Sequence, residues 1–193
     1  MNDNRSRLLE IAEGSVQRTG LKALSFRTLA DEVGIKSSSV HYHFPEKADL
    51  ARTLIEQYRD RLFLELESIA ASDAPLRNRI LAFVDVFARV AQEDRICLLC
   101  MMASEFAVLN ADNQALLANV FTNLENWLAQ LLENNRASLT TELSSLEIAR
   151  LAITGLEGAL LVDRVMRNSD RLNAQKTALL QLVKLPLTEA TVC

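Results

Sequence analysis

Apolar residues recur every three or four positions along nearly the whole chain, which is the spacing of one face of an α-helix. The clearest stripe comprises Leu116, Leu117, Val120, Phe121, Leu124, Trp127, Leu128, Leu131 and Leu132. The 193 residues include five glycines and three prolines, fewer than sheets and turn-rich folds need. The sequence therefore predicts an all-α protein of about nine helices, with no repeat at a fixed period.

Capping residues and helix breakers set the expected helix boundaries. Gly20 suits the end of the first helix, and two short helices are expected over 26–33, capped by Ser25, and 38–43. The other helices are expected over 46–70, 75–92, 94–109, 116–132, 144–167 and 170–185. Four local features support these ranges: a cap at Asp94, a break over 110–113, a capping box of Ser144 with Glu147, and a stop at Pro186.

Charge is distributed unevenly along the chain. Hydrophobic residues make up 49% and charged residues 24%, which excludes wholesale disorder. The net charge is −4, but residues 1–47 hold 7 Lys or Arg against 6 Asp or Glu, whereas the rest hold 14 against 19. This balance argues against a protein that coats nucleic acid along its length, but it is compatible with a local DNA-binding surface.

Three cysteines, at positions 97, 100 and 193, form a poor disulfide framework because their number is odd. The N-terminus has no apolar signal core, and the most apolar stretch, 96–109, is too short to span a bilayer and contains Glu105. We therefore expect a reduced, cytoplasmic protein with no membrane partner. Only two histidines occur, and there is no second cysteine pair, so neither a metal site nor a cofactor is expected.

Segment 26–44 carries the most specific pattern in the chain. Two short helices flank a turn at Gly34, where a positive φ is expected. Four apolar residues stand where these helices must pack together: Leu29, Val33, Ile35 and Val40. This is the pattern of a helix-turn-helix, whose second helix enters the DNA major groove. A plain pair of helices without a DNA role is the alternative.

The residues around this segment resemble the TetR family of bacterial one-component regulators. The resemblance lies in Ser25-Phe-Arg-Thr-Leu-Ala-Asp-Glu-Val-Gly34, a serine-rich recognition helix, and His41-Tyr-His-Phe-Pro-Glu-Lys-Ala-Asp-Leu50. The family most often has tyrosine where this chain has His41. The resemblance covers the first 50 residues. It implies a DNA-binding domain over 1–47, followed by a ligand-binding and dimerisation domain over 48–193.

Ten side chains are candidates for DNA contact: Ser25, Arg27, Lys36, Ser37, Ser38, Ser39, His41, Tyr42, His43 and Lys47. The three consecutive serines open the recognition helix, where backbone N–H groups and the helix dipole favour a phosphate. Lys47 is expected in the first turn of the next helix, where the helix dipole disfavours a positive charge. A phosphate facing Lys47 would explain a cation at this position. Phe44 is expected to fill the core instead.

The remaining helices offer candidates for a ligand pocket and a dimer interface. Aromatic, sulfur-containing and acidic residues on the middle helices are the pocket candidates: Phe83, Phe87, Cys97, Met101, Glu105, Phe106, Phe121 and Trp127. The last two helices are the candidates for the dimer interface. Their small and apolar candidate residues are Gly155, Leu156, Gly158, Ala159 and Val162, with further apolar area from Leu160 and Leu161. Ordinary core packing is the alternative for both sets.

The sequence favours a dimeric repressor that binds a near-palindromic operator and is released by a small-molecule effector. An alternative input is a thiol sensor at Cys97 and Cys100, because a helix capped by Asp94 would place Cys97 in its first turn beside Arg95. A helical-bundle enzyme is a remote alternative, since no nucleophile elbow, phosphate loop or metal triad is present. No catalytic residue is expected.

Overall fold

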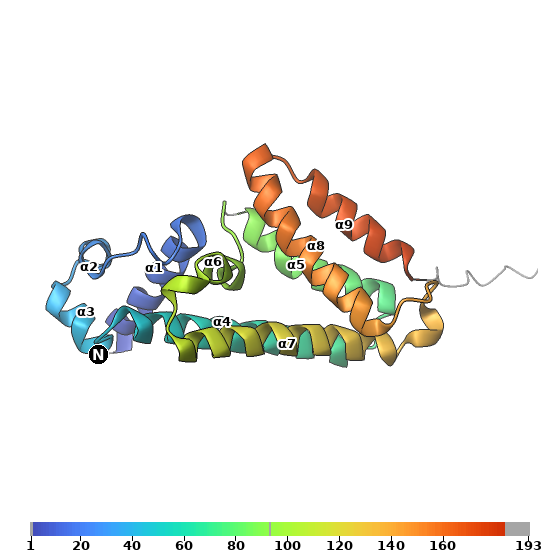
Figure 1. Ribbon diagram of the computed structural model, residues 1–193, viewed down its shortest axis with the longest axis horizontal. Coiled ribbons are helices and arrows are strands. Elements are labelled where there is room, and N and C mark those ends of the chain that lie inside the picture. Colours follow the sequence, from blue (N-terminus) through green and yellow to red (C-terminus); the bar gives the residue numbers. More distant parts are fainter. Residues whose placement is uncertain (1, 93, 184–193) are drawn as a thin grey trace, which may run out of the picture. The chain divides into compact units, whose positions relative to one another are not determined.

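The computed structural model describes residues 2–92 and 94–183, and the elements of this part of the chain are helices joined by loops (Figure 1). It contains nine α-helices: α1 (Asn2–Thr19), α2 (Phe26–Val33), α3 (Ser37–His43), α4 (Lys47–Ala71), α5 (Leu76–Gln92), α6 (Leu98–Ser104), α7 (Ala111–Glu133), α8 (Ser145–Met166) and α9 (Asp170–Gln181). Two 3₁₀ turns, η1 (Phe106–Val108) and η2 (Arg136–Ser138), complete the described elements. The predicted all-α class is confirmed.

Local capping explains why several predicted helix ends are correct. The Ser25 hydroxyl accepts a hydrogen bond from the Thr28 N–H at 3.1 Å, and α2 ends at Gly34 with φ +79°. Gly20, with φ +89°, follows α1 as predicted. The predicted capping box at the start of α8 is also present, because the Ser144 N–H donates to the Glu147 carboxylate at 2.8 Å.

The segment between α5 and α7 differs from the predicted helix over 94–109. Asp94 has φ +53° and does not cap a helix, and α6 begins only at Leu98, with Cys97 at the N-cap position. The Ile96 N–H instead donates to the Gln17 carbonyl of α1 at 3.1 Å. This bond to a distant helix replaces a local helical bond, which sequence periodicity does not reveal.

The predicted break over 110–113 does separate two helices, but it ends earlier than predicted, at Asn110. The Asn110 side chain accepts a hydrogen bond from the Asn113 N–H at 3.0 Å, which caps α7 and lets it begin at Ala111. At the other end of the chain, α9 stops at Gln181 rather than at the predicted 185. The predicted stop at Pro186 and the third cysteine, Cys193, lie outside the described residues.

The chain divides into two compact units. Unit 1 combines the described residues up to 65 with those of 89–123. In this unit α1 packs against α2 and α6, and α2 packs against α3. Leu8, Ala12 and Val16 of α1 are fully buried in its core, as is Leu50 of α4.

Unit 2 combines residues 66–88 with the described residues from 124 onward. Helices α8 and α9 run side by side in opposite directions (Figure 1). Phe83 and Leu156 are fully buried in this unit. Packing thus divides the chain differently from the predicted functional boundary after Lys47, which stays a prediction. In the described part of the chain, no helix combines the length and apolar character that crossing a bilayer requires.

Candidate nucleic-acid interface

Helices α2 and α3 form a helix-turn-helix held together by buried apolar side chains. Leu29 is 1% exposed and Val40 is fully buried. The Gly34 N–H donates to the Ala30 carbonyl at 2.9 Å, which closes α2 and turns the chain toward α3. Gly34 adopts a left-handed backbone conformation, which glycine tolerates with little strain because it has no Cβ atom.

The outer surface of α3 carries hydroxyl, imidazole and phenol groups and no acidic residue. Ser37, Ser38 and His41 are exposed, Ser39 and His43 are half-buried, and Tyr42 is 79% exposed. The His41 ring packs edge-on against Phe26 at 4.9 Å, and its Nδ1 lies 3.4 Å from the Pro45 carbonyl. The imidazole is therefore oriented by its neighbours, whereas the Tyr42 ring projects outward.

The three basic residues that were predicted to contact DNA differ in their surroundings. Arg27 and Lys36 are exposed on α2 and at the start of α3. Lys47 is half-buried at the start of α4, and its Nζ donates to the Lys22 carbonyl at 3.2 Å. Burial lowers the pKa of the Lys47 ammonium, and the negative charge of Glu105 partly offsets that effect.

Two residues near the motif have structural roles. Ser25 is exposed, but its hydroxyl is already engaged as the cap of α2. Phe44 is 1% exposed, and the Arg5 guanidinium lies over its ring at 5.4 Å. The predicted core role of Phe44 is confirmed.

The same segment matches known proteins. Residues 8–54 match the family described as "Bacterial regulatory proteins, tetR family". A TetR transcriptional regulator from Legionella pneumophila is 31% identical, with a TM-score of 0.87 over 93% of this chain and 97% of that one. The chain belongs to the TetR family of transcriptional regulators. The members of this family are DNA-binding regulators rather than enzymes, which bears out the expectation of no catalysis.

Two further relatives extend the comparison for this TetR-family chain. A TetR-family regulator from Agrobacterium tumefaciens has a TM-score of 0.88 at 22% identity, over 95% of this chain and 99% of that one, and shares the fold. The HTH-type transcriptional repressor KstR2 of Mycobacterium tuberculosis is 35% identical over 80 residues. That match spans 42% of this chain and only 40% of the repressor's length.

The predicted ligand-pocket residues of this TetR-family chain are divided between the two units. Phe83, Phe87 and Trp127 lie in unit 2, where the Phe83 ring is 5.3 Å from Phe87 and stacks on Trp127 at 5.6 Å. Phe83 also lines a cavity whose walls are entirely apolar: Ile80, Phe83, Leu128, Leu132, Ile148, Ala152, Leu179 and Leu182. The free space inside is about 10 Å³, which leaves room for one water molecule at most.

The other five pocket candidates belong to unit 1 and do not line that cavity. Met101 and Phe121 are half-buried, and Phe106 is 48% exposed. Cys97 is buried and accepts a hydrogen bond from the Tyr58 hydroxyl at 3.6 Å. The first-turn position predicted for Cys97 is wrong, because it depended on the absent Asp94 cap. The Glu105 carboxylate accepts a hydrogen bond from the Lys22 N–H at 2.8 Å.

The predicted interface residues on α8 also separate into two groups. Leu156 and Ala159 are buried within unit 2, and a Cβ at Gly155 would lie 2.5 Å from the Gln175 side chain of α9. Gly158 and Val162 face outward, the latter 44% exposed. Leu161, which was also predicted to supply apolar area, continues this surface, whereas sequence reasoning missed Leu151, Val165 and Met166.

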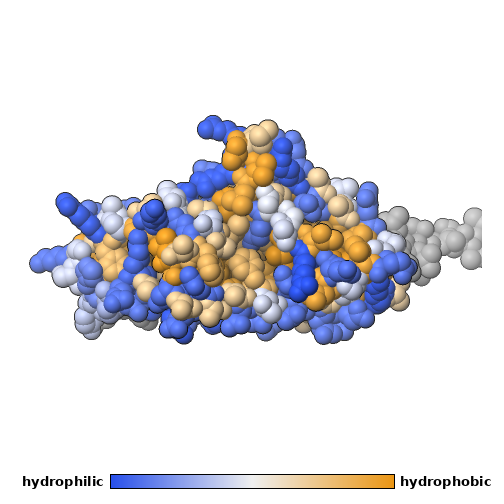
Figure 2. Space-filling model, in the orientation of Figure 1, coloured by the Kyte–Doolittle hydropathy of each residue, from blue (hydrophilic) through white to orange (hydrophobic). Residues whose placement is uncertain are grey.

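We call this surface the α8 face, and its exposed apolar residues are Leu151, Leu161, Val162, Val165 and Met166. Apolar surface is visible over the C-terminal part of α8 in Figure 2. Exposed apolar side chains gathered on one helix are a common mark of an interaction site. The α8 face therefore fits the predicted interface better than Leu156 or Ala159 does.

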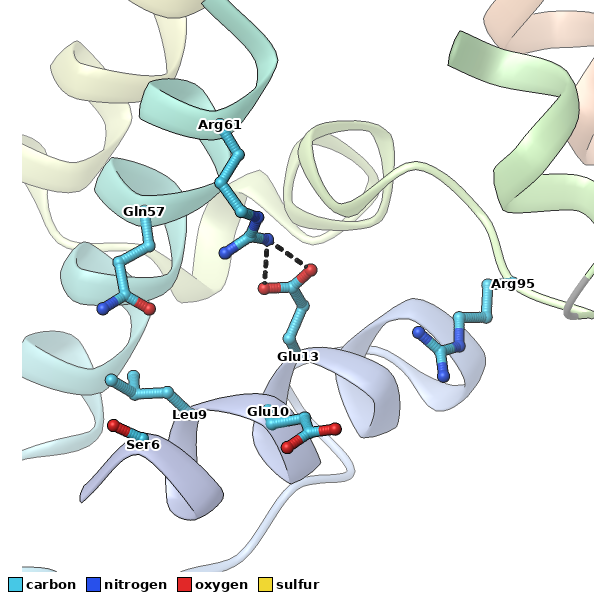
Figure 3. A pocket seen from close by; sticks show the side chains of 7 residues that line it. All are labelled: Ser6, Leu9, Glu10, Glu13, Gln57, Arg61 and Arg95. Atoms are coloured by element: carbon cyan, nitrogen blue, oxygen red, sulfur yellow. Dashed lines mark hydrogen bonds and ion pairs between the residues drawn. The ribbon is translucent and has the colours of Figure 1, made fainter. Parts of the chain in front are cut away.

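Unit 1 also contains a polar groove of about 290 Å³ between α1, α4 and the loop before α6 (Figure 3). Its lining residues are Ser6, Leu9, Glu10, Glu13, Gln57, Arg61 and Arg95. Arg61 of α4 points at Glu13 of α1, and its Nη2 lies 2.6 Å from both carboxylate oxygens. Two acids balance two arginines here, so the groove gives DNA phosphates no net attraction.

Proposed function

We propose that this TetR-family chain is a transcriptional repressor that binds a near-palindromic DNA operator as a dimer and releases it on binding a small apolar effector. The observation that carries the proposal is the outward surface of α3, which offers hydroxyl and aromatic groups without any acidic residue. KstR2, a relative over this region, is described as an HTH-type transcriptional repressor. A cytoplasmic location and the division into residues 1–47 and 48–193 are part of the proposal.

The exposed side chains of α2 and α3 are the proposed DNA contacts. Tyr42 is 79% exposed and is suited to a base edge or phosphate in the major groove. Arg27, Lys36 and Lys47 supply the positive charge that phosphates require. The remaining proposed contacts are short donors or ring nitrogens: Ser25, Ser37, Ser38, Ser39, His41 and His43.

A protection footprint on the DNA that flanks the coding region tests this function. We expect a symmetric protected site that weakens as salt rises, because binding releases counterions from the phosphates. The footprint is repeated with apolar compounds to find one that releases the protein. An asymmetric site, or no protection on this DNA or on duplexes selected from random sequence, would overturn the proposal.

Lys47→Ala should weaken binding to all DNA sequences and reduce the slope of log affinity against log salt by about 1, the value expected for one lost phosphate contact. The measurement is fluorescence anisotropy on a labelled duplex over a range of salt concentrations. Lys176→Ala is the matched control, since Lys176 lies on α9 of unit 2 and the change in net charge is the same. An unchanged slope would remove Lys47 from the phosphate contacts.

The α8 face is the proposed dimer interface. Among the described residues, apart from the two chain neighbours of Gly158 and the adjacent backbone of α8, no atom lies within 4 Å of a Cβ built on this glycine. A glycine inside a helix costs about 1 kcal/mol relative to alanine, so one copy of the chain gives no reason for it. Close approach by a second copy of α8 supplies that reason and covers the exposed apolar side chains.

Gly158→Leu should weaken the dimer about tenfold, because the larger side chain overpacks a tight contact between copies. Sedimentation equilibrium gives the dissociation constant. Ala118→Leu, at an exposed position of α7, is the control and should leave it unchanged. If Gly158→Leu also leaves the dimer constant unchanged, this part of α8 is not at the interface.

The apolar cavity of unit 2 is the proposed effector site. Its walls carry no charged or hydrogen-bonding side chain, which favours an apolar ligand. The free space is too small for any organic effector, so binding must displace the surrounding helices. A ligand that prefers such an expanded arrangement shifts the protein toward it, which is the thermodynamic requirement for release of DNA.

A further inference from the structure

Glu105, which directly follows α6, contacts the turn that leads into the helix-turn-helix. Its carboxylate accepts a hydrogen bond from the Lys22 N–H at 2.8 Å, across 83 residues of sequence. A Cβ added at Gly20 would lie 2.6 Å from the Glu105 Oε1 atom. The carboxylate therefore packs directly on the turn between α1 and α2, where glycine leaves it room.

The same turn binds Lys47. The Lys22 carbonyl accepts a hydrogen bond from the Lys47 Nζ at 3.2 Å, while the Lys22 N–H is held by Glu105. The backbone of Lys22 thus bonds both to the Glu105 carboxylate and to the Lys47 ammonium. The negative charge of Glu105 also raises the pKa of Lys47 against the larger effect of burial, so the two side chains interact electrostatically.

We propose that Glu105 is a positioning residue for DNA binding, which fixes the turn before α2 and moderates the attraction of Lys47 for a DNA phosphate. The inference rests on the proposed function, in which Lys47 contacts phosphate. The Glu105 carboxylate attracts the Lys47 ammonium, so this ammonium attracts a phosphate less strongly than a lysine without a nearby anion would. Glu105 therefore lowers general affinity for DNA while it holds the helix-turn-helix in place.

Glu105→Gln separates these two effects. Glutamine keeps an oxygen that accepts the Lys22 N–H but removes the negative charge. We expect binding to a short duplex of random sequence to become about two- to fivefold tighter at low salt, in line with one partly exposed charge interaction. The gain should disappear at high salt because of screening. Glu105→Ala, which also loses the hydrogen bond, should bind more weakly than Glu105→Gln.

The decisive comparison places Glu105→Gln in the Lys47→Ala background. If Glu105 acts on Lys47, the gain in affinity should be absent there. Glu10→Gln, which lies on the exposed side of α1, makes the same change in net charge and should produce no gain in either background. Circular dichroism of the full-length variants checks that each one folds.

Each outcome bears on the proposal. No gain from Glu105→Gln, or an equal gain with and without Lys47, would overturn the inference while leaving the DNA-binding function in place. If Lys47→Ala itself changes neither the affinity nor the salt slope, the proposed phosphate contact fails, and the moderating role of Glu105 fails with it. A gain confined to the chain that retains Lys47 supports the inference.

Discussion

Phe44→Ala should lower the free energy of unfolding by about 3–5 kcal/mol, the usual cost of deleting a buried aromatic side chain. Phe44 is 1% exposed at the end of α3, and the Arg5 guanidinium over its ring would lose its partner as well. Stability is commonly only about 5–15 kcal/mol, so the loss would be a large share of the total. Urea denaturation followed by circular dichroism measures it.

Tyr42→Ala is the matched control, two positions earlier on the same helix. Tyr42 is 79% exposed, so its removal should change the unfolding free energy by less than about 0.5 kcal/mol. It should nevertheless weaken DNA binding, since Tyr42 is a proposed contact. A small effect of Phe44→Ala, or a large loss of stability from Tyr42→Ala, would contradict the assignment of one ring to the core and the other to the DNA surface.

The helix-turn-helix could be predicted because its determinants are local. Ser25 and Gly34 mark the two ends of α2, and the buried residues Leu29 and Val40 appear in the sequence as an apolar pattern. Each of these features depends on residues within one or two turns. Sequence spacing therefore carries nearly all the information needed for α2 and α3.

The segment between α5 and α7 could not be predicted in the same way. Its course depends on contacts with distant parts of unit 1, such as the hydrogen bond from the Ile96 N–H to the Gln17 carbonyl. Glu105 belongs to the same class: the sequence left open whether its charge in an apolar stretch faces a ligand or is paired, and its hydrogen-bond partner is the backbone N–H of Lys22. The spacing of apolar residues along one helix does not reveal contacts with residues that are distant in the sequence.

The α8 residues show a different limit. Leu156 and Val162 both fit an apolar helix, but Leu156 is fully buried and Val162 is 44% exposed. When a helix is apolar on more than one side, the pattern does not say which side its own chain covers. The packing of α9 decides this, and it leaves the apolar side chains of the α8 face exposed.

Asp163→Asn should lower the free energy of unfolding at neutral pH by about 2–3 kcal/mol, the cost of losing hydrogen bonds to a charged group. The Asp163 carboxylate, at the end of α8, accepts the Leu172 N–H at 2.9 Å and the Arg171 N–H at 3.2 Å. The carboxylate thereby satisfies two backbone N–H groups in the first turn of α9 and places a negative charge at the N-terminal end of that helix. An asparagine keeps one oxygen acceptor but would point its NH2 group at the other donor.

The pH dependence of this loss identifies its cause. Burial alone would raise the pKa of Asp163, but the hydrogen bonds from Leu172 and Arg171 and the charge of Arg171 outweigh it, so the pKa lies below its ordinary value. A carboxyl group with a depressed folded-state pKa stabilises the protein above its unfolded pKa of about 3.9 and loses that contribution as pH falls through the folded value. The difference between wild type and Asp163→Asn should therefore shrink below about pH 4.

Denaturant unfolding at a series of pH values from neutral to acidic measures this trend. Asp85→Asn is the matched control: it removes one carboxylate from the same unit, but Asp85 is exposed and lies 4.0 Å from Lys176. Such a surface pair contributes at most about 1 kcal/mol, so the control should show a small loss at every pH. A loss in Asp163→Asn that stays constant into acid would mean that the shape of the side chain, and not its charge, holds α8 and α9 together.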